Sequence, residues 1–161
     1  MLYDIIIIGG GPAGVAAAVY VARKRLKTLF LTESFGGQSV VSDGIQNWIG
    51  ELHISGFDLA KKLEDHVRSF PDVVEIKTPE RAYTVRSIAC ESGTRVCDFE
   101  VATEQKNTYQ GRVVILASGA RRRKLGIPGE DTFNGKGVAY CSTCDAPLFS
   151  GKKVAVVGGG N

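Results

Sequence analysis

The chain has 161 residues, of which 43% are hydrophobic and 23% are charged, and its formal net charge is +3. These values are typical of a soluble globular protein, and the small net charge gives no indication of a nucleic acid partner. The length allows one domain, or one domain and part of a second.

A charge-free stretch near the start does not predict a membrane span. Residues 5–22 contain no Asp, Glu, Lys or Arg. However, glycines and Pro12 interrupt the stretch, Asp4 precedes it, and no basic residues come before it as they do in a signal peptide. We therefore expect no targeting segment, no membrane segment and a cytoplasmic location.

The first predicted element is a strand that runs into a glycine turn. Residues 5–8 are consecutive isoleucines, as in a strand that is covered on both faces of a parallel sheet. Gly9, Gly11 and Gly14 then form the pattern G-x-G-x-x-G. In this context the three glycines permit a tight turn, close approach of a pyrophosphate and close packing of the next helix. The motif therefore predicts a dinucleotide site rather than a merely structural turn.

The elements after the glycine turn support the same interpretation. A helix is predicted over residues 12–24, with Pro12 at its first position and Ala13 next to it, and its positive end favours phosphate. A second strand is predicted over residues 28–32 and ends at Glu33. Glu33 lies near the offset of about 20 residues at which an acidic side chain binds the ribose hydroxyls.

A second glycine-rich turn and a second helix follow. Residues 34–38 lack the periodicity of a helix or strand, and such a loop can lie against a ligand. Ser55 and Asp58 form a capping-box pattern at the start of a helix predicted over residues 56–70, which Pro71 ends. Its apolar side chains recur at helical spacing: Phe57, Ala60, Leu63, Val67 and Phe70.

The period changes towards two from residue 73, which predicts strands. The candidates for a short antiparallel insertion are residues 73–77, 82–89, 96–103 and 108–110. Residues 112–118 are again a continuous apolar strand, which suits a return to the parallel sheet. Because parallel strands present ligands at their carboxyl ends, the turn that follows is a second candidate contact with the cofactor: Ala117, Ser118 and Gly119.

A basic run with nearby Pro and Gly predicts a linker over residues 120–130. It separates a domain of residues 1–119 from the start of another at residues 131–161. Within the second part, an apolar strand predicted over residues 154–157 meets two more glycines, Gly158 and Gly160, which begin a second dinucleotide fingerprint. The predicted fold class is therefore α/β, with a Rossmann-like parallel sheet, an antiparallel insertion and the start of a second Rossmann-like domain.

Cys141 and Cys144 form a C-x-x-C motif, and Asp145 follows directly. Two sulfurs at this spacing can form a disulfide, and a thiol at a helix N-terminus has a lowered pKa. Asp145 is a candidate proton donor and acceptor for the thiolates. A four-thiolate zinc site with Cys90 and Cys97 is the alternative, but their spacing fits zinc poorly and we expect no metal.

These motifs together resemble the low-molecular-weight thioredoxin reductases and the core of the alkyl hydroperoxide reductase flavoprotein. The matching segments, in order, are IIIIGGGPAG, FGGQ, NWIG, VILASGARRRKLGIPGE, YCSTCD and KKVAVVGGGN. The sequence departs from the family pattern at a few positions, where residues that the mechanism does not need differ: Arg25, Ile49, Ser118 and Ala146.

The resemblance implies a reaction and its site residues. Electrons pass from NADPH through FAD and the Cys141–Cys144 disulfide to a thioredoxin-like or peroxiredoxin-linked protein, and Asp145 manages the proton. The implied enzyme is a homodimer. The 1–119 domain binds FAD and residues 131–161 begin the NADPH domain. The resemblance adds cofactor contacts at four positions: Gly36, Gly37, Gln38 and Asn47.

Members of the resembled family continue well beyond the length of this chain. They complete the NADPH domain and then return to close the FAD domain, so we expect residues 1–161 alone to be inactive. Two alternatives stay open from the sequence. One is a non-catalytic module that binds FAD or its ADP half, and the other is a zinc-stabilised structural domain.

Overall fold

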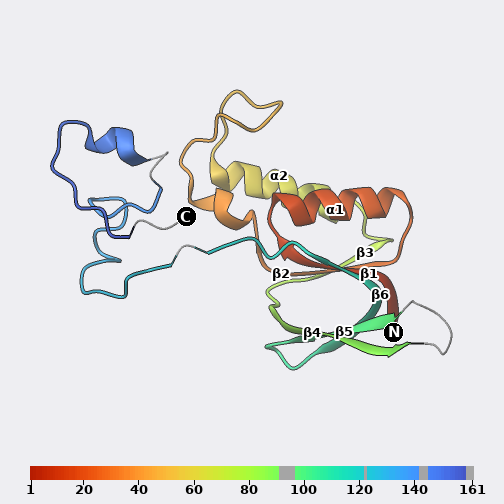
Figure 1. Cartoon of the computed structure of the whole chain (residues 1–161). Coiled ribbons are helices and arrows are strands. Elements are labelled where there is room, and N and C mark those ends of the chain that lie inside the picture. Colours follow the sequence, from red (N-terminus) through yellow and green to blue (C-terminus); the bar gives the residue numbers. More distant parts are fainter. Residues whose placement is uncertain (91–96, 122, 142–144, 159–161) are drawn as a thin grey trace. The chain divides into compact units, whose positions relative to one another are not determined.

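The chain forms two compact units, Met1–Ala120 and Arg121–Asn161, called here the N-terminal and C-terminal units. The structure, a computed structural model, describes residues 1–90, 97–121, 123–141 and 145–158. The N-terminal unit contains one six-stranded sheet of order β3-β2-β1-β6-β5-β4 (Figure 1). Its elements are β1 (Leu2–Gly10), α1 (Pro12–Arg23), β2 (Thr28–Phe35), η1 (Gly37–Val41, a 3-10 helix), α2 (Gly56–Arg68), β3 (Val74–Lys77), β4 (Ala82–Cys90), β5 (Cys97–Thr103) and β6 (Thr108–Leu116).

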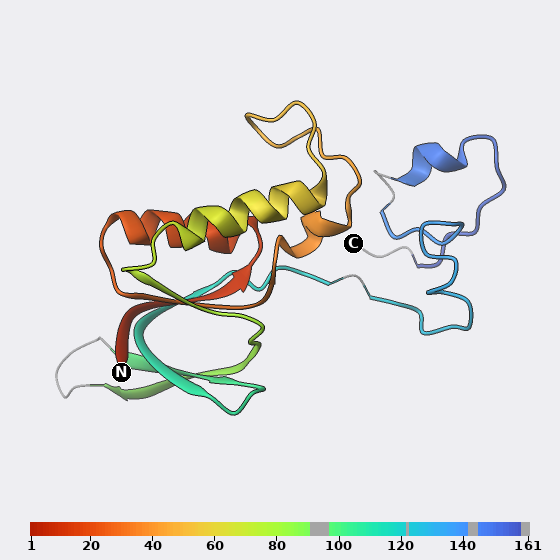
Figure 2. The same cartoon turned by 180° about the vertical axis from the view of Figure 1, so that it is seen from behind.

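The predicted α/β fold class is confirmed. β1 pairs in parallel with β2 and β6, and β2 pairs in parallel with β3. β5 pairs antiparallel with β4 on one side and with the start of β6 on the other. Figure 2 shows α1 and α2 together on one side of the parallel strands, while β4 and β5 curve across their other side. Both faces of the parallel strands are therefore covered, as their continuous apolar sequences predict.

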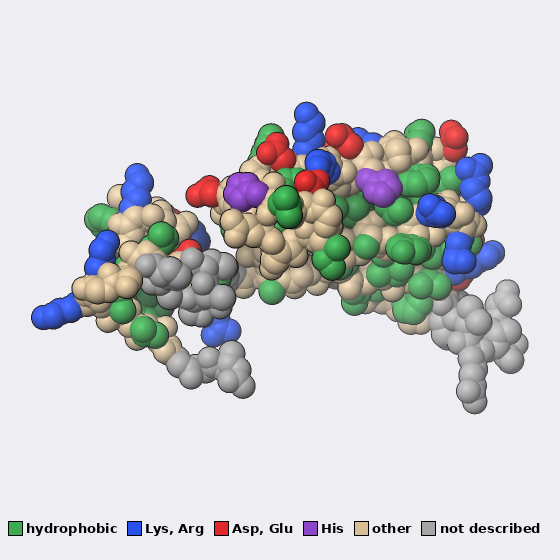
Figure 3. Space-filling model, turned by 90° about the horizontal axis from the view of Figure 1, so that it is seen from above, with side chains coloured by type: hydrophobic (Ala, Val, Ile, Leu, Met, Phe, Trp, Pro, Cys, Tyr) green, Lys and Arg blue, Asp and Glu red, His purple; other side chains and the backbone are tan. Residues whose placement is uncertain are grey.

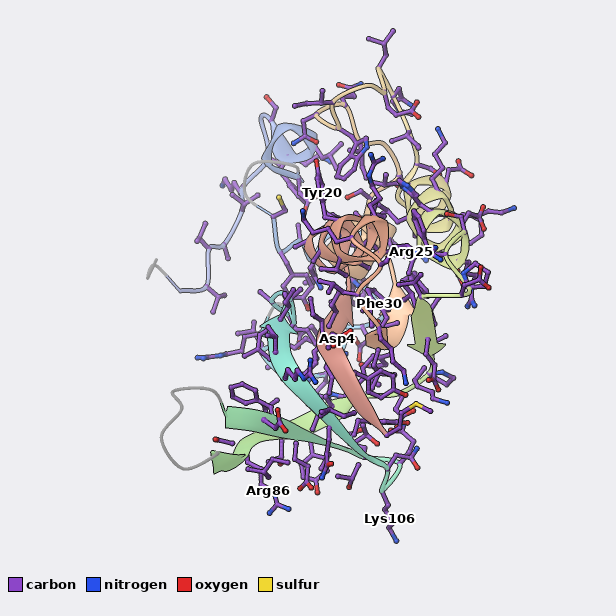
Figure 4. The ribbon with its side chains drawn as sticks, turned by 90° about the vertical axis from the view of Figure 1, so that its right-hand side faces the viewer. Asp4, Tyr20, Arg25, Phe30, Arg86 and Lys106 are labelled. Atoms are coloured by element: carbon purple, nitrogen blue, oxygen red, sulfur yellow. The ribbon has the colours of Figure 1, made fainter. Side chains whose placement is uncertain are left out.

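Two hydrophobic clusters form on the opposite faces of the sheet. Ile7 of β1 and Phe30 of β2 pack under the helices, whereas Ile6 and Leu31 pack against the antiparallel strands. Figure 4 shows Phe30 beneath α1 and Tyr20 on the outer side of that helix. Burial of each such side chain contributes about 1.5–3 kcal/mol. Figure 3 shows the helix face from above, where hydrophobic side chains lie between charged ones.

The predicted capping box starts α2. The Ser55 hydroxyl accepts a hydrogen bond from the Asp58 N–H at 3.0 Å and donates one to the Asp58 carboxylate at 2.6 Å. The helix ends at Arg68, two residues before the predicted end, and the side chain of Phe57 is 70% exposed rather than part of the apolar face. The face that packs on the sheet consists of Leu59, Ala60, Leu63 and Val67.

The assignment of residues 73–77 to the antiparallel insertion is wrong. The observed strand, β3, pairs in parallel with β2, with Thr28 opposite Val74. Alternating hydrophobicity indicates a strand but does not indicate its direction. The crossover through α2 returns the chain to the same edge of the sheet, and this connection makes the strands parallel.

The segments predicted as separate strands, residues 108–110 and 112–118, are parts of the single strand β6, which ends at Leu116. Its first part pairs with β5 and its longer part pairs with β1, from Leu2 opposite Gln110 to Ile8 opposite Leu116. Gly111, at the predicted gap, is buried where a Cβ would lie 2.7 Å from Cγ1 of Ile6. The glycine therefore permits close packing against β1 and does not break the strand.

β2 is longer than predicted, and a short helix replaces part of the predicted turn. The strand continues past Glu33 to Phe35, whose ring stacks on that of Phe30 with a centroid distance of 5.6 Å. The chain then forms η1, where the sequence predicts only an irregular loop. Burial of Phe35 explains the extension, because tertiary packing outweighs the local turn preference of the following glycines.

The C-terminal unit consists mainly of turns, with the 3-10 helix η2 (Ala146–Phe149). The prediction of a strand over residues 154–157 is wrong, because these residues adopt no regular structure and Val154, Val156 and Val157 are exposed. A strand requires a hydrogen-bonded neighbour, and none of the described residues pairs with this segment. No helix among the described residues is long and apolar enough to span a bilayer.

A buried carboxylate joins the parallel and antiparallel parts of the sheet. The Glu80 side chain is 6% exposed and accepts hydrogen bonds from the Thr103 hydroxyl at 2.8 Å, the Asn107 amide at 2.9 Å and the Tyr109 hydroxyl at 3.0 Å. Its backbone N–H donates to the Thr32 carbonyl oxygen of β2 at 2.9 Å. Glu80 thus fastens the β5–β6 hairpin to the end of β2.

The surroundings of Glu80 favour its charged form. Burial alone would raise the pKa of Glu80, but the hydrogen bonds from Asn107, Thr103 and Tyr109 hold that pKa below its ordinary value. Burial and the bond to Glu80 raise the pKa of Tyr109 to about 12. The carboxylate is therefore ionised and the phenol protonated at neutral pH, which keeps all three donors and their acceptor in place.

The substitution Glu80→Gln should lower the free energy of unfolding by about 1–3 kcal/mol, because its NH₂ group cannot accept bonds from these buried donors. Urea denaturation followed by circular dichroism measures the change. Glu104→Gln is the control, since Glu104 pairs with Arg81 at a site where both side chains are half exposed. Such a pair contributes less than about 1 kcal/mol, and equal effects of the two substitutions would contradict this role of Glu80.

The same carboxylate should make stability depend on pH. Because the folded-state pKa of Glu80 is lowered, its contribution is present above its ordinary pKa of 4.5 and is lost as the pH falls through the folded value. The wild-type free energy of unfolding should therefore fall below that pH. The fall should be smaller in Glu80→Gln, as urea denaturation at a series of pH values will measure.

Candidate functional site

Two of the three glycines of the first motif are enclosed by the protein's own backbone. A Cβ at Gly9, whose φ is +118°, would lie 2.2 Å from the carbonyl oxygen of Ala117. A Cβ at Gly14 would lie 1.9 Å from the carbonyl oxygen of Gly9. These contacts hold the start of α1 against β1 and the end of β6, so both glycines serve the packing of the loop.

Gly11 differs from the other two glycines because space lies beside it. It caps the N-terminus of α1 with φ −76°, a conformation that any residue can adopt. A Cβ at Gly11 would lie 3.9 Å from its nearest neighbour, the Cα of Gly37. By helix geometry, the first-turn N–H groups of Ala13 and Gly14 have no carbonyl oxygen one turn before them. Open space beside such N–H groups suits the phosphates of a dinucleotide.

The second glycine-rich segment lies directly beside the first. The Gly36 N–H donates a hydrogen bond to the Gly10 carbonyl oxygen at 2.8 Å, and a Cβ at Gly37 would approach the Cα of Gly11 to 3.2 Å. Both glycines have positive φ, +89° and +54°. The structure therefore brings the two predicted glycine loops together at the carboxyl ends of β1 and β2.

The predicted turn after β6 reaches the same place. The Ala117 N–H donates to the Ile8 carbonyl oxygen at 2.8 Å, and the Ser118 backbone nitrogen lies 3.2 Å from the position of a Cβ at Gly9. Gly119 has φ +65° and open space around it. Three segments far apart in the sequence thus meet at one edge of the parallel sheet. We call these three segments together the glycine cluster. It consists of residues Gly9–Gly14, Gly36–Gly37 and 117–119.

Three other predicted cofactor residues lie on the surface of the N-terminal unit. Glu33 is an exposed residue inside β2, and Gln38 is exposed in η1. Asn47 lines an open hollow of about 400 Å³ formed by residues 46–52. Among the described contacts, none joins Asn47 to the glycine cluster.

The C-x-x-C motif, predicted to be redox-active, lies in the C-terminal unit. Cys141 is disulfide-bonded, and Cys144 falls outside the described residues. The Asp145 carboxylate accepts a hydrogen bond from the Cys141 N–H at 3.1 Å, and the Asp145 N–H donates to the Cys141 carbonyl oxygen at 2.9 Å. Asp145 therefore binds both the backbone N–H and the backbone carbonyl oxygen of Cys141. Of the second fingerprint, Gly158 lies in open space and Gly160 is outside the described residues.

Glu130 and Tyr140, which the sequence analysis did not single out, are hydrogen-bonded to each other in the segment before this motif. The Glu130 carboxylate is buried and accepts hydrogen bonds from two backbone N–H groups and from the Tyr140 hydroxyl. No periodic signal marks such residues, because their partners lie in irregular structure. The one sequence signal for this role of Glu130 is its position directly after glycines and a proline. Among the described side chains, no group of three or more His, Cys, Asp or Glu is placed to hold a metal ion.

Comparison with known proteins identifies the family of the chain. The family model of the pyridine nucleotide-disulphide oxidoreductases matches residues 3–161. The chain belongs to this family. Pyridine nucleotide-disulphide oxidoreductases are flavoproteins with Rossmann-like folds, and the resemblance inferred from the sequence motifs is confirmed.

Similar members of the family come from several bacteria. The chain is 42% identical to the F subunit of the alkyl hydroperoxide reductase of Pseudomonas aeruginosa and 41% identical to an NADH dehydrogenase of Bacillus subtilis. Each match covers 99% of the chain but 29% of the relative. Among solved structures, thioredoxin reductase of Streptococcus pyogenes superimposes with a TM-score of 0.75 at 36% identity, over 92% of the chain and 45% of the reductase. The chain thus spans less than half the length of these relatives.

The glycine contacts predict that two substitutions destabilise the chain to different extents. Gly14→Ala should destabilise the chain by about 3 kcal/mol, the upper end of the usual cost of overpacking, because the added methyl group meets a backbone oxygen that cannot move aside. Gly11→Ala should cost no more than about 1 kcal/mol, since its methyl group enters open space. Chemical denaturation of both variants measures the difference. Equal destabilisation would mean that the space beside Gly11 is filled by the protein.

Proposed function

We propose that the chain is part of a flavoprotein disulfide reductase. Electrons would pass from NADPH through FAD and a Cys141–Cys144 disulfide to a thioredoxin-like or peroxiredoxin-linked protein. The observation that carries this proposal is the open space beside Gly11, at the centre of the glycine cluster. The relatives' names, which include a thioredoxin reductase and an alkyl hydroperoxide reductase, support the two classes of partner.

The residues of the N-terminal unit fit FAD. When bound, FAD supplies the two-electron chemistry that connects a hydride donor with a disulfide. Gly11 leaves room for the pyrophosphate beside the first turn of α1, whose N–H groups would bind it, and Glu33 would bind the ribose hydroxyls. Gly36 and Gly37 let a second stretch of backbone approach the same space.

Cys141 and Cys144 would carry out the exchange with the partner protein. One thiolate attacks the partner's disulfide, forms a mixed disulfide and releases one partner thiol. The second cysteine then attacks the mixed disulfide, releases the other partner thiol and restores the Cys141–Cys144 bond. Asp145 would donate and accept the protons of these steps, beside the backbone that it holds.

The domain division follows the same proposal. Residues 1–119 would bind FAD, residues 120–130 would link the domains, and residues 131–161 would begin the NADPH domain. The boundary of the two compact units in the sequence, between Ala120 and Arg121, supports this division.

A non-catalytic module that binds FAD or ADP is the second candidate. The observation that favours it is the location of the whole glycine cluster in the N-terminal unit. Steady-state NADPH oxidation with a disulfide acceptor distinguishes the two in the full-length protein. Turnover supports the reductase, whereas flavin binding without turnover supports the module.

A bulky side chain beside the open space should prevent flavin binding. Gly11→Val should weaken the binding of FAD to the 161-residue chain at least about tenfold, because its methyl groups occupy the space of the pyrophosphate. Flavin fluorescence titration measures the affinity. Ala16→Val, on the exposed side of α1, is the control and should bind FAD as the wild type does. Unchanged affinity in a folded Gly11→Val variant would contradict the assignment of this loop.

Loss of either motif cysteine should stop disulfide exchange without stopping the reduction of flavin by NADPH. In the full-length enzyme, Cys141→Ser and Cys144→Ser should each abolish disulfide turnover, because exchange needs an attacking and a resolving sulfur. Flavin reduction by NADPH, followed by absorbance in a stopped-flow instrument, should continue. Cys90→Ser, in β4 of the other unit, should retain turnover. Turnover in either motif variant would count against the pair.

A further inference from the structure

A buried glutamate organises the linker of the C-terminal unit. The Glu130 side chain is 4% exposed, and its carboxylate accepts hydrogen bonds from the backbone N–H of Leu125 at 2.9 Å and of Gly126 at 2.6 Å. Gly126 has φ +73°, so the backbone curls around the carboxylate. Successive N–H groups in this arrangement form a concave anion site, which here holds a side chain of the same segment.

The same carboxylate holds the residue that precedes the redox motif. The Tyr140 hydroxyl donates a hydrogen bond to Glu130, and Tyr140 is the neighbour of Cys141 in the chain. Beyond it, Asp145 binds the backbone of Cys141 on both sides. The linker is therefore connected to the motif by the hydrogen bonds of Glu130 and by the peptide bond between Tyr140 and Cys141.

Hydrogen bonds rather than a nearby cation stabilise the charge of Glu130. Lys124, the adjacent basic residue of the linker, pairs with Asp131 instead. A buried carboxylate is costly unless donors surround it, and removal of one donor leaves it undersatisfied. Loss of the hydrogen bond from Tyr140 would therefore be unfavourable for the Glu130 carboxylate.

The protonation states of both partners are stable around neutral pH. The bonds from Tyr140 and then from the Leu125 N–H hold the pKa of Glu130 below its ordinary value. The bond to Glu130, followed by burial, raises the pKa of Tyr140 to about 12. The phenol therefore remains a donor and the carboxylate an acceptor under the conditions in which thiols exchange.

We propose that Glu130, acting through Tyr140, is a positioning residue for the Cys141–Cys144 pair. This inference rests on the proposed redox function of that pair. Anchoring Tyr140 restricts the backbone that carries Cys141, so the reduced chain loses less conformational freedom when the disulfide forms. Restricted reactants have a high effective concentration, which favours closure of the disulfide. Loosening the anchor should make the disulfide easier to reduce.

Equilibration with glutathione tests the proposal on the 161-residue chain. Two glutathione thiols are oxidised to one glutathione disulfide while the Cys141–Cys144 bond is reduced to two thiols, so electrons and protons balance. Alkylation of the thiols, followed by peptide mass mapping, measures the reduced fraction of this pair separately from that of Cys90 and Cys97. The equilibrium constant for disulfide formation is the readout, which a general loss of stability elsewhere would not change.

Tyr140→Phe and Glu130→Gln should each lower this constant about three- to tenfold, the effect expected for loss of one hydrogen bond. Tyr109→Phe is the matched control, because it removes an equivalent bond from tyrosine to glutamate in the N-terminal unit. It should leave the constant unchanged. Amide hydrogen exchange at Leu125 and Gly126 should become faster in Glu130→Gln and report the loss of the anchor directly.

Each other result would overturn the proposal. An unchanged constant in Tyr140→Phe and Glu130→Gln, with exchange at Leu125 and Gly126 accelerated, would show that the anchor does not affect the pair. An equal shift in Tyr109→Phe would assign the effect to general stability. If the wild-type chain formed no Cys141–Cys144 disulfide in glutathione buffers, the proposed redox function would fail first, and the positioning role with it.

Discussion

The contact between Gly14 and the carbonyl oxygen of Gly9 is the constraint on which the glycine cluster depends. A Cβ at Gly14 would lie 1.9 Å from that oxygen, so only glycine lets α1 begin this close to β1. The helix start then lies beside the end of β6 and the loop after β2, which supply the other two segments of the cluster. One backbone contact thus determines where three distant parts of the chain can meet.

Buried glutamates perform a comparable task where regular structure ends. Glu80 joins the β5–β6 hairpin to the end of β2, and Glu130 joins the linker to the residue before Cys141. In each case a tyrosine hydroxyl is one of the donors. A carboxylate accepts several bonds at once, so a single buried side chain can order segments that have no repeating backbone pattern of their own.

The two motifs of the chain lie in different compact units. The glycine cluster belongs to one unit and the cysteine motif to the other, while the chain covers 45% of the length of a related thioredoxin reductase. The proposed binding of FAD and the proposed exchange of a disulfide would therefore depend on separate sets of local contacts. In the proposed enzyme, catalysis requires that these sets be brought together, whereas each set can be tested by itself.

The sequence by itself determined the features that depend on neighbouring residues: the strand and glycine turn of residues 5–14, the capping box at Ser55, the C-x-x-C motif and the α/β class. Only the tertiary structure decided the parallel direction of β3, the continuity of β6 through Gly111, the absence of a strand at residues 154–157 and the bond between Tyr140 and Glu130. The reason is physical. Caps, turns and hydrophobic periodicity arise within a few residues, whereas strand pairing and buried hydrogen bonds depend on partners that the fold brings from elsewhere in the chain.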